Sequence, residues 1–477
     1  MWRADVVLYN HQKTVKSGRR QNDEGAAKML TDSDVKRMSE EVQRHLINLI
    51  RIDTTNPPGN ETAACEYMKA ELAKDGLESE ILESAPGRGN FVCRLKGDGS
   101  KRPLALASHL DVVPCERESW SVDPYAAVVK DGFIWGRGSL DTKSLTAIQM
   151  VTVAELKRKN IPLKRDVILL AVADEEQSGS YGMGWMTTKH FDKIDCEYQI
   201  NEGAGIGIPM GNKNVYQVQT AEKGANWFKL TTRGEPGHGS IPRKDNCVVR
   251  MAKAIEKVSH PLPMRKTKVV EGFINGMASK ALGFPKGLLF KQLLNPALCG
   301  PVLKAIRSAE PDTGDMLSSM LRDSISPTMF HAGNKENVIP PKCEAVIDCR
   351  ILPGQTSAGF KKMLSEMIDV DSIELLVEQV PDPTESPADT ELYRCIERAI
   401  MKNDPKGVLV PYISTGATDS RFLRKKGVVA YGFSPFLSKV DFREFLYTIH
   451  GHDERIPIDG VDFSVRVTYD LVADFCG

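Results

Sequence analysis

Histidine, aspartate and glutamate residues follow a series of apolar runs along the chain, and side chains of these types can bind metal ions. In sequence order they are His109, Asp111, Asp141, Glu175, Glu176, Glu202 and His450. Imidazole nitrogens and carboxylate oxygens are donors that zinc and similar divalent ions take in proteins. Two histidines and three carboxylates suffice for two metal ions if one carboxylate bridges them. The chemistry indicated is the binding of divalent metal ions.

Each of these residues also has a structural explanation when it is taken alone. Most histidines at strand ends are structural, Asp141 could cap the helix that follows it, and one of two adjacent glutamates usually faces solvent. The spacing alone leaves open whether Glu175 or Glu176 is a ligand. It also leaves open whether Asp111 is a ligand or orients His109. Their joint occurrence at five strand-to-loop junctions favours the metal site.

The apolar runs are typical of an α/β domain. The predicted strands are 91–95, 104–110, 166–173 and 198–200, and residues 144–158 form an amphipathic helix between them. Strands that alternate with helices indicate a largely parallel sheet. Ligands gather at the carboxyl ends of strands in such sheets, and the metal-binding residue types stand at these ends.

The pattern changes near residue 221. Further on, strands are expected at 226–234 and 343–352 and helices at 246–258 and 358–368, which indicates a smaller α+β unit inserted into the first domain. We expect residues 262–330 to be a partly helical insertion within it. The expected domains are a polar N-terminal tail (1–33), a catalytic domain in two parts (34–221 and 385–477) and an inserted lid or dimerisation domain (222–384).

Charge and cysteine content exclude several function classes. The chain has 63 basic and 63 acidic residues and no long basic run, so we expect no nucleic-acid and no membrane partner. No segment approaches the run of about 18 apolar residues that a membrane span needs. The ten cysteines are scattered without a Cys-x-x-Cys pair. Reduced thiols and a cytoplasmic location are the expectation.

Seven motifs occur in an order that resembles a known enzyme superfamily. They are "SHLDVVP", "GRGSLDTK", "ADEEQSG", "NEGAG", "GEPGHGSIP", "NVIPPKCEAVIDCR" and "HGHDERI". From about residue 35 to its C-terminus the chain is similar to the dinuclear-zinc aminoacylase, acetylornithine deacetylase, succinyl-diaminopimelate desuccinylase and carboxypeptidase superfamily. The resemblance implies a zinc exopeptidase-like fold, with a mixed, largely parallel sheet, flanking helices and an inserted α+β, ferredoxin-like lid domain.

The resemblance also implies a role for each metal-binding residue. His109 would bind one zinc ion and His450 the other, with Asp141 bridging the two. Glu202 would complete the site of His109, and Glu176 the site of His450. The implied cofactor is therefore two Zn²⁺ per subunit, with Co²⁺ or Mn²⁺ as substitutes. The family ligand stands four residues before the glutamate of the closing motif, which selects His450 over His452.

Catalytic roles follow from the same resemblance. Asp111 would hold the second ring nitrogen of His109 and so fix its tautomer. Glu175 would take a proton from the metal-held water and deliver it to the leaving amine. His238 would stabilise the oxyanion. In the family this histidine lies on the lid and reaches the site of the partner subunit, so a homodimer is implied.

Substrate contacts can be assigned to three further residues. Arg350 and Arg421 could grip a substrate carboxylate, and Asn337 could meet the amide. A surface or interdomain ion pair explains each arginine equally well. The position after Asp141 is often acidic in the family but is Thr142 here, which could alter the local turn.

The long 262–330 segment resembles the carboxypeptidase-S-like and N-acyl-amino-acid hydrolase branch. The expected function is therefore metal-dependent hydrolysis of an amide bond in a small peptide or N-acyl amino acid. A biosynthetic deacylase of the acetylornithine or succinyl-diaminopimelate type is the first alternative, and a non-catalytic binding relative is a second. Glycines in "NEGAGIGIPMG" lack the Gly-x-Gly-x-x-Gly spacing of a dinucleotide site.

Overall fold

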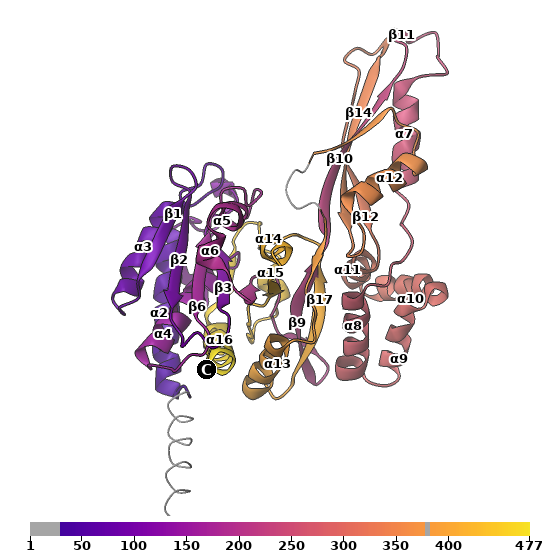
Figure 1. Ribbon diagram of the computed structural model, residues 1–477. Coiled ribbons are helices and arrows are strands. Elements are labelled where there is room, and N and C mark those ends of the chain that lie inside the picture. Colours follow the sequence, from indigo (N-terminus) through magenta and orange to yellow (C-terminus); the bar gives the residue numbers. More distant parts are fainter. Residues whose placement is uncertain (1–28, 377–381) are drawn as a thin grey trace, which may run out of the picture.

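The computed structural model describes residues 29–376 and 382–477 (Figure 1). Most of the expected N-terminal tail, 1–33, lies outside these residues. The described strands form one ten-stranded sheet, one four-stranded sheet and two small ones. In Figure 1 the large sheet and its helices form one body, and the four-stranded sheet projects from it as a long arm.

The large sheet is mixed, with parallel strands at its centre. Its order is β1-β2-β6-β3-β7-β18-β9-β16, and β8 and β17 also pair with β9. The pairs β3–β6, β3–β7, β7–β18 and β9–β17 are parallel. The strands are β1 (Ser79–Glu83), β2 (Gly89–Leu95), β3 (Leu104–His109), β6 (Val167–Val172), β7 (Tyr198–Asn201), β8 (Ile208–Met210), β9 (Lys213–Glu222), β16 (Thr384–Glu385), β17 (Gly407–Ser414) and β18 (Val429–Gly432).

Helices cover both faces of this sheet, which is why its central strands read as unbroken apolar runs. Leu104 and Leu106 of β3 face one core, and Ala105 and Ala107 face the other. The helices of the first core are α2 (Asp32–Arg51), α3 (Glu61–Ala73), α4 (Lys143–Arg158), α13 (Glu391–Asn403) and α16 (Val461–Cys476). Those of the second are α5 (Met183–Lys189), α6 (Phe191–Ile194) and α14 (Ser420–Lys425). The predicted α/β fold class is confirmed.

The four-stranded sheet is antiparallel and has the order β12-β14-β10-β15. Alternate residues of β14 are buried, since only one face is covered by helices. Phe228 of β10 and Phe360 of a covering helix stack in this core. The elements are β10 (Gly224–Arg233), β12 (Ser324–Ala332), β14 (Lys342–Ile351), β15 (Ser372–Leu375), α7 (Cys247–Val258) and α12 (Ser357–Met367).

Residues 268–321 form a helical segment between the two sheets. Its helices are α8 (Lys268–Gly276), α9 (Lys286–Lys291), α10 (Pro296–Ala309) and α11 (Pro311–Leu321), with a π-helix η2 (Met277–Leu282) and a 3₁₀ helix η3 (Gln292–Leu294). Phe273 and Ile274 of α8 share a core with Val410 and Ile413 of β17. The helices of the 262–330 segment therefore pack on the large sheet, and only β12 joins the small one.

Hydrogen bonds join three chain segments that connect the two sheets. Lys223, between β9 and β10, donates to the carbonyl oxygens of Ser319 and Arg322 at 3.0 and 2.8 Å. Arg265, before α8, donates to Asp323 at 3.0 and 3.2 Å. Lys223 and Asp323 are buried. We call Lys223, Arg265 and Asp323 the junction cluster.

The remaining elements frame the loops around the sheets. They are η1 (Arg117–Ser119), β4 (Val128–Lys130), β5 (Phe133–Trp135), β11 (Gly237–His238), β13 (Val338–Ile339), α15 (Arg443–Leu446), β19 (Arg455–Pro457) and η4 (Ile458–Gly460). None of the helices in the described part of the chain combines the length and apolar character that a membrane crossing requires.

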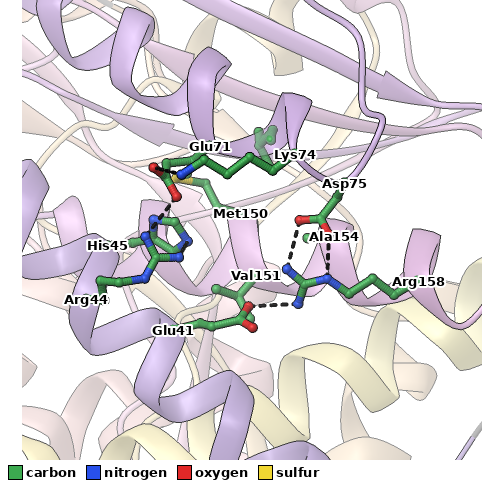
Figure 2. A pocket seen from close by; sticks show the side chains of 11 residues that line it. Glu41, Arg44, His45, Glu71, Lys74, Asp75, Met150, Val151, Ala154 and Arg158 are labelled. Carbon is green, nitrogen blue, oxygen red and sulfur yellow. Dashed lines mark hydrogen bonds and ion pairs between the residues drawn. The ribbon is translucent and has the colours of Figure 1, made fainter.

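A small polar cavity of about 80 Å³ lies between α2, α3 and α4 (Figure 2). Acidic and basic side chains at its rim pair with one another, as Arg158 does with Asp75 at 2.7 Å and with Glu41 at 2.8 Å. His45 is buried there, and its Nδ1 lies 2.8 Å from the hydroxyl of Tyr67. Burial lowers the pKa of His45 to about 4. The cavity is therefore built around a neutral imidazole.

Candidate active site

The carboxyl ends of three adjacent parallel strands bring the predicted metal-binding side chains together. His109 ends β3, Glu175 and Glu176 follow β6, and Glu202 follows β7, and these strands are neighbours in the order β6-β3-β7. Two more side chains come from loops. Asp141 precedes α4, and His450 follows α15.

Asp141 is shared between the two histidines. Its Oδ1 lies 3.0 Å from Nε2 of His109, and its Oδ2 lies 3.1 Å from Nε2 of His450. Each oxygen of one carboxylate thus faces a different imidazole. Two possible metal positions result, one between Asp141 Oδ1 and His109 and the other between Asp141 Oδ2 and His450.

A second carboxylate lies next to the histidine at each of these positions. Glu202 Oε2 is 3.5 Å from His109 Nε2, and Glu176 Oε2 is 3.2 Å from His450 Nε2. Glu175 lies on the His109 side, because its carboxylate is within 4.8 Å of donor atoms of both His109 and Glu202. The donor atoms of His109, Asp141 and Glu176 form a second such group.

The donor set fits divalent metal ions. Four carboxylates and two imidazoles meet in a small volume, and such a concentration of negative charge needs a compensating cation. Glu176 Oε1 is buried and accepts no hydrogen bond from any residue that the structure describes. A buried carboxylate oxygen without a hydrogen-bond partner fits the role of a metal ligand. The side chains at this site therefore fit divalent ions as ligands.

Sequence comparison identifies the family of the chain. The model of peptidase family M20/M25/M40 matches residues 105–474. The chain belongs to this family. It is thereby an enzyme of the M20 metallopeptidases, a family of metal-dependent hydrolases.

Individual M20 relatives are distant but extend over most of the chain. The human protein "N-fatty-acyl-amino acid synthase/hydrolase PM20D1" is 26% identical and aligns with 91% of this chain and 86% of its own length. "Probable carboxypeptidase S-like 2" of Dictyostelium discoideum is 28% identical, over 80% of this chain and 74% of the relative. The M20 metallo-carboxypeptidase Sso-CP2 of Sulfolobus solfataricus superposes with a TM-score of 0.67 at 19% identity, covering 91% of this chain and 99% of that one.

Burial and neighbouring charges shift the pKa values in this M20 site. Burial and the nearby Glu202 carboxylate raise the pKa of Glu175 well above its usual range. Hydrogen bonds with Asp141 and Glu176 raise the pKa of His450 to about 10. Burial opposes ionisation of Asp141, but hydrogen bonds from both imidazoles outweigh it and lower the pKa of Asp141.

Asp111 holds the backbone that carries the two glutamates. Its Oδ1 accepts the N–H of Glu175 and its Oδ2 the N–H of Glu176, both at 3.1 Å. Asn56 also donates to Oδ2, at 2.9 Å. His109 Nδ1 lies 3.0 Å from the backbone oxygen of Asp111 and 3.5 Å from its Oδ1. Asp111 thus reaches three of the metal-binding residues.

Glu454 positions the loop that carries Asp141. Its carboxylate is fully buried and accepts the backbone N–H groups of Gly138, Leu140 and Asp141 at 3.0, 2.8 and 3.1 Å. Arg137 donates to it at 2.7 Å. The sequence singled out Glu454 only as a marker for counting back to His450. Its capping function could be found only in three dimensions, because more than 300 residues separate the partners.

Asp419 is a buried carboxylate that the sequence analysis missed. Both of its oxygens are buried without a hydrogen-bond partner among the described residues. Burial raises its pKa to about 8, and its charge in turn raises that of Glu175. The sequence analysis singled out Arg421 instead, two residues later. An acidic residue before a short helix looks like an ordinary cap, so no sequence signal marked it.

The remaining predicted site residues divide into two groups. Arg421 lies beside the site, where its Nη2 donates to the Ser178 carbonyl at 2.9 Å and its charge lowers the pKa of Glu175. His238, Asn337 and Arg350 lie instead on the four-stranded sheet and its loops. His238 is exposed in β11, at the end of the arm that is distant from β3 (Figure 1). The structure therefore does not bring His238 to the metal-binding residues of its own chain.

Local contacts occupy the residues on the arm. Arg350 donates to both oxygens of Asp348 at 2.7 and 2.9 Å. His238 Nδ1 lies 2.7 Å from the Ser240 hydroxyl. The carbonyl of Asn337 accepts the Gly239 N–H at 2.7 Å, so Asn337 is next to the His238 loop. These two residues form one polar group at the tip of the arm.

Proposed function

We propose that the protein hydrolyses an amide bond in a small peptide or an N-acyl amino acid at a dinuclear metal site. The observation that carries the proposal is the Asp141 carboxylate, whose two oxygens face two different histidines at 3.0 and 3.1 Å. Membership of the M20 family supports the metal-dependent reaction. The names of the relatives, an N-fatty-acyl-amino acid hydrolase and a carboxypeptidase S-like protein, support the substrate class.

Each metal would have its own set of ligands. His109 and Glu202 would hold one ion, His450 and Glu176 the other, and Asp141 would bridge them. Zn²⁺ suits two imidazoles with carboxylate oxygens, and Co²⁺ or Mn²⁺ could replace it. When bound, the ions supply Lewis acidity that polarises the amide carbonyl and makes water more acidic.

Glu175 would move the proton. Its carboxylate would accept a proton from the attacking water, whose oxygen forms the new bond to the amide carbon. The same carboxyl group would then donate the proton to the nitrogen as the carbon–nitrogen bond breaks, releasing an amine and a carboxylate. The position of Glu175 supports this role, because its carboxylate lies within 4.8 Å of the donor atoms of His109 and Glu202.

A homodimer would complete the site. His238 is exposed far from the metal-binding residues of its own chain (Figure 1), so it could serve as an oxyanion donor to a partner's site. The edge strand β12 supports such an assembly, since its outer residues include Met329 and Phe330, which are half exposed. Apolar side chains on an open sheet edge favour pairing with a second strand.

Three side chains could recognise the substrate. Arg421 is already beside Glu175, so it is our candidate for a carboxylate of the substrate. Asn337 and Arg350 would contribute from the arm, and Arg350 would have to exchange Asp348 for the substrate.

A cytoplasmic location is part of the proposal. All ten cysteines are free thiols, and nine of them are buried. Proteins of oxidising compartments commonly convert such thiols to disulfides, whereas cytosolic proteins keep them reduced.

The deciding experiment compares Glu175→Gln with Glu176→Gln in protein loaded with zinc or cobalt. The first variant is expected to keep two metal ions per chain and to lose turnover by at least about 100-fold. The second is expected to lose one ion. The substrates are dipeptides, N-acetyl and N-fatty-acyl amino acids, N-acetylornithine and N-succinyl-diaminopimelate, with the released amine as the readout.

The outcomes separate the parts of the proposal. Turnover of N-acetylornithine or N-succinyl-diaminopimelate alone would replace the proposed substrate class by a biosynthetic deacylase. Wild-type turnover in Glu175→Gln would refute the proton-transfer role. Amine release from none of the substrates would refute the hydrolase proposal as a whole.

A further inference from the structure

The short helix α9 presents apolar side chains to solvent at the outer edge of the helical segment. Phe284 is 89% exposed, Leu288 58% and Leu289 60%. Phe284 lies in the turn just before α9, and Leu288 and Leu289 lie within the helix. We call these three residues the α9 face. In Figure 1, α9 lies on the side of α8 that points away from the large sheet.

The sequence around this face is strongly basic. Residues 272–309 contain Lys280, Lys286, Lys291, Lys304 and Arg307 and no aspartate or glutamate. The whole chain has a net charge of zero, so the surplus is local. From the net charge of the whole chain we expected no membrane partner. A net charge averaged over the chain does not reveal a local basic segment such as this one.

Most of the positive charge is not neutralised within the protein. Lys280 pairs with Glu397 and Arg307 with Asp315. Lys286, Lys291 and Lys304 form no ion pair with any residue in the described ranges. Two of these lysines, Lys286 and Lys291, are the first and last residues of α9 itself. The α9 face is thus bracketed by free ammonium groups.

We propose that the α9 face and its lysines bind the surface of an anionic phospholipid membrane. Exposed Phe and Leu side chains can enter the region between headgroups and acyl chains, while lysines on the same element meet the phosphates and carboxylates. A second copy of this chain is less suited than a membrane to cover the α9 face. A closed two-fold contact places the face against itself, which would bring like charges together.

The proposal is independent of the amide hydrolysis, since it uses none of the residues of the metal site. It is also compatible with a cytoplasmic protein, because anionic lipids are concentrated in the cytoplasmic leaflet. Binding should be reversible and sensitive to salt. Each lysine near an anionic surface contributes about 1 kcal/mol, or about a fivefold increase in partitioning.

Flotation of the full-length protein with lipid vesicles tests the proposal. The vesicles contain phosphatidylcholine alone or phosphatidylcholine mixed with phosphatidylserine. We expect the wild type to float with the second kind only and to be released by high salt. The double variant Lys286→Gln/Lys291→Gln should bind about 25-fold more weakly. The triple variant Phe284→Ser/Leu288→Ser/Leu289→Ser should lose binding.

A matched control removes two exposed lysines elsewhere. Lys361→Gln/Lys362→Gln makes the same charge change on α12, in the small sheet's domain, and should bind vesicles like the wild type. All substituted side chains are exposed, so thermal unfolding should be unchanged in every variant. If the triple variant fails to fold, the lysine pair and its control still decide.

Three results would overturn the proposal. The first is failure of the wild type to float with phosphatidylserine vesicles. The second is equal loss of binding in the α12 control, which would indicate non-specific attraction. The third is a dimer in sedimentation experiments that the triple variant abolishes while vesicle binding is absent, since a second copy would then cover the α9 face.

Discussion

Asp111→Asn replaces the carboxylate that organises the metal site with an amide of nearly the same shape. The native side chain offers two acceptor oxygens, one to the N–H of Glu175 and one to the N–H of Glu176 and the amide of Asn56. An asparagine has one oxygen. If that oxygen keeps Glu176 and Asn56, the NH₂ group faces the N–H of Glu175, and two donors oppose each other.

The magnitude follows from this mismatch. A buried N–H group without an acceptor costs about 1–3 kcal/mol. We therefore expect the free energy of unfolding of the metal-free protein to fall by about 2 kcal/mol. The backbone of both glutamates and the ring of His109 lose part of their support, so metal affinity should fall by about 10- to 100-fold, as for other residues that orient ligands.

Urea unfolding measures the first quantity, and calorimetric titration with Zn²⁺ measures the second. Asp166→Asn is the control. Asp166 accepts the N–H of Gly97 at 2.8 Å and pairs with Arg94 and Lys96, but it lies before β6, at the opposite end of that strand from Glu175. The Asp166→Asn variant should have a lower free energy of unfolding and an unchanged affinity for Zn²⁺. Zinc affinity within twofold of wild type in Asp111→Asn would refute the assigned role of Asp111.

Two further predictions concern buried charges. Glu454→Gln breaks the buried pair with Arg137 and should lower the free energy of unfolding by about 3–5 kcal/mol, measured by urea unfolding; a loss below 1 kcal/mol would contradict the capping role. Burial lowers the pKa of His45 to about 4 from 6.5, so the unfolded chain takes up the proton first. Stability should fall as the pH drops from 6.5 to 4, by about 3 kcal/mol from this group, and a pH series should show a shallower fall in His45→Gln.

The strands of the large sheet could be predicted from sequence because both of their faces are buried. Such strands appear as continuous apolar runs, and 104–110 and 166–173 correspond to β3 and β6 within one residue at each end. The metal-binding residue types stood at the ends of these runs. Their convergence then followed from the parallel arrangement of the strands.

Other parts of the site depend on contacts between distant segments. Glu454 and Asp419 act through burial and through backbone groups, and neither leaves a pattern in neighbouring residues. The position of α8 was equally inaccessible. Its apolar face predicts a helix, but the same face would pack as well on the small sheet as on β17. Whether α8 packs on the small sheet or on β17 can be seen only in the folded structure, because both surfaces are apolar.

The junction cluster limits how the arm can move. The chain passes between the two sheets near residues 223, 265 and 323 and again between Leu375 and Thr384, and buried hydrogen bonds of Lys223 and Asp323 join the first three passages. Sliding of one sheet past the other would break all of them together. Because Lys223 and Asp323 are buried, losing these bonds would leave buried polar groups without partners, so the cluster holds the base of the arm to the large sheet. Figure 1 shows β11, the strand that contains His238, at the end of the arm distant from β9, so a rotation at the cluster would displace His238 further than residues close to β9.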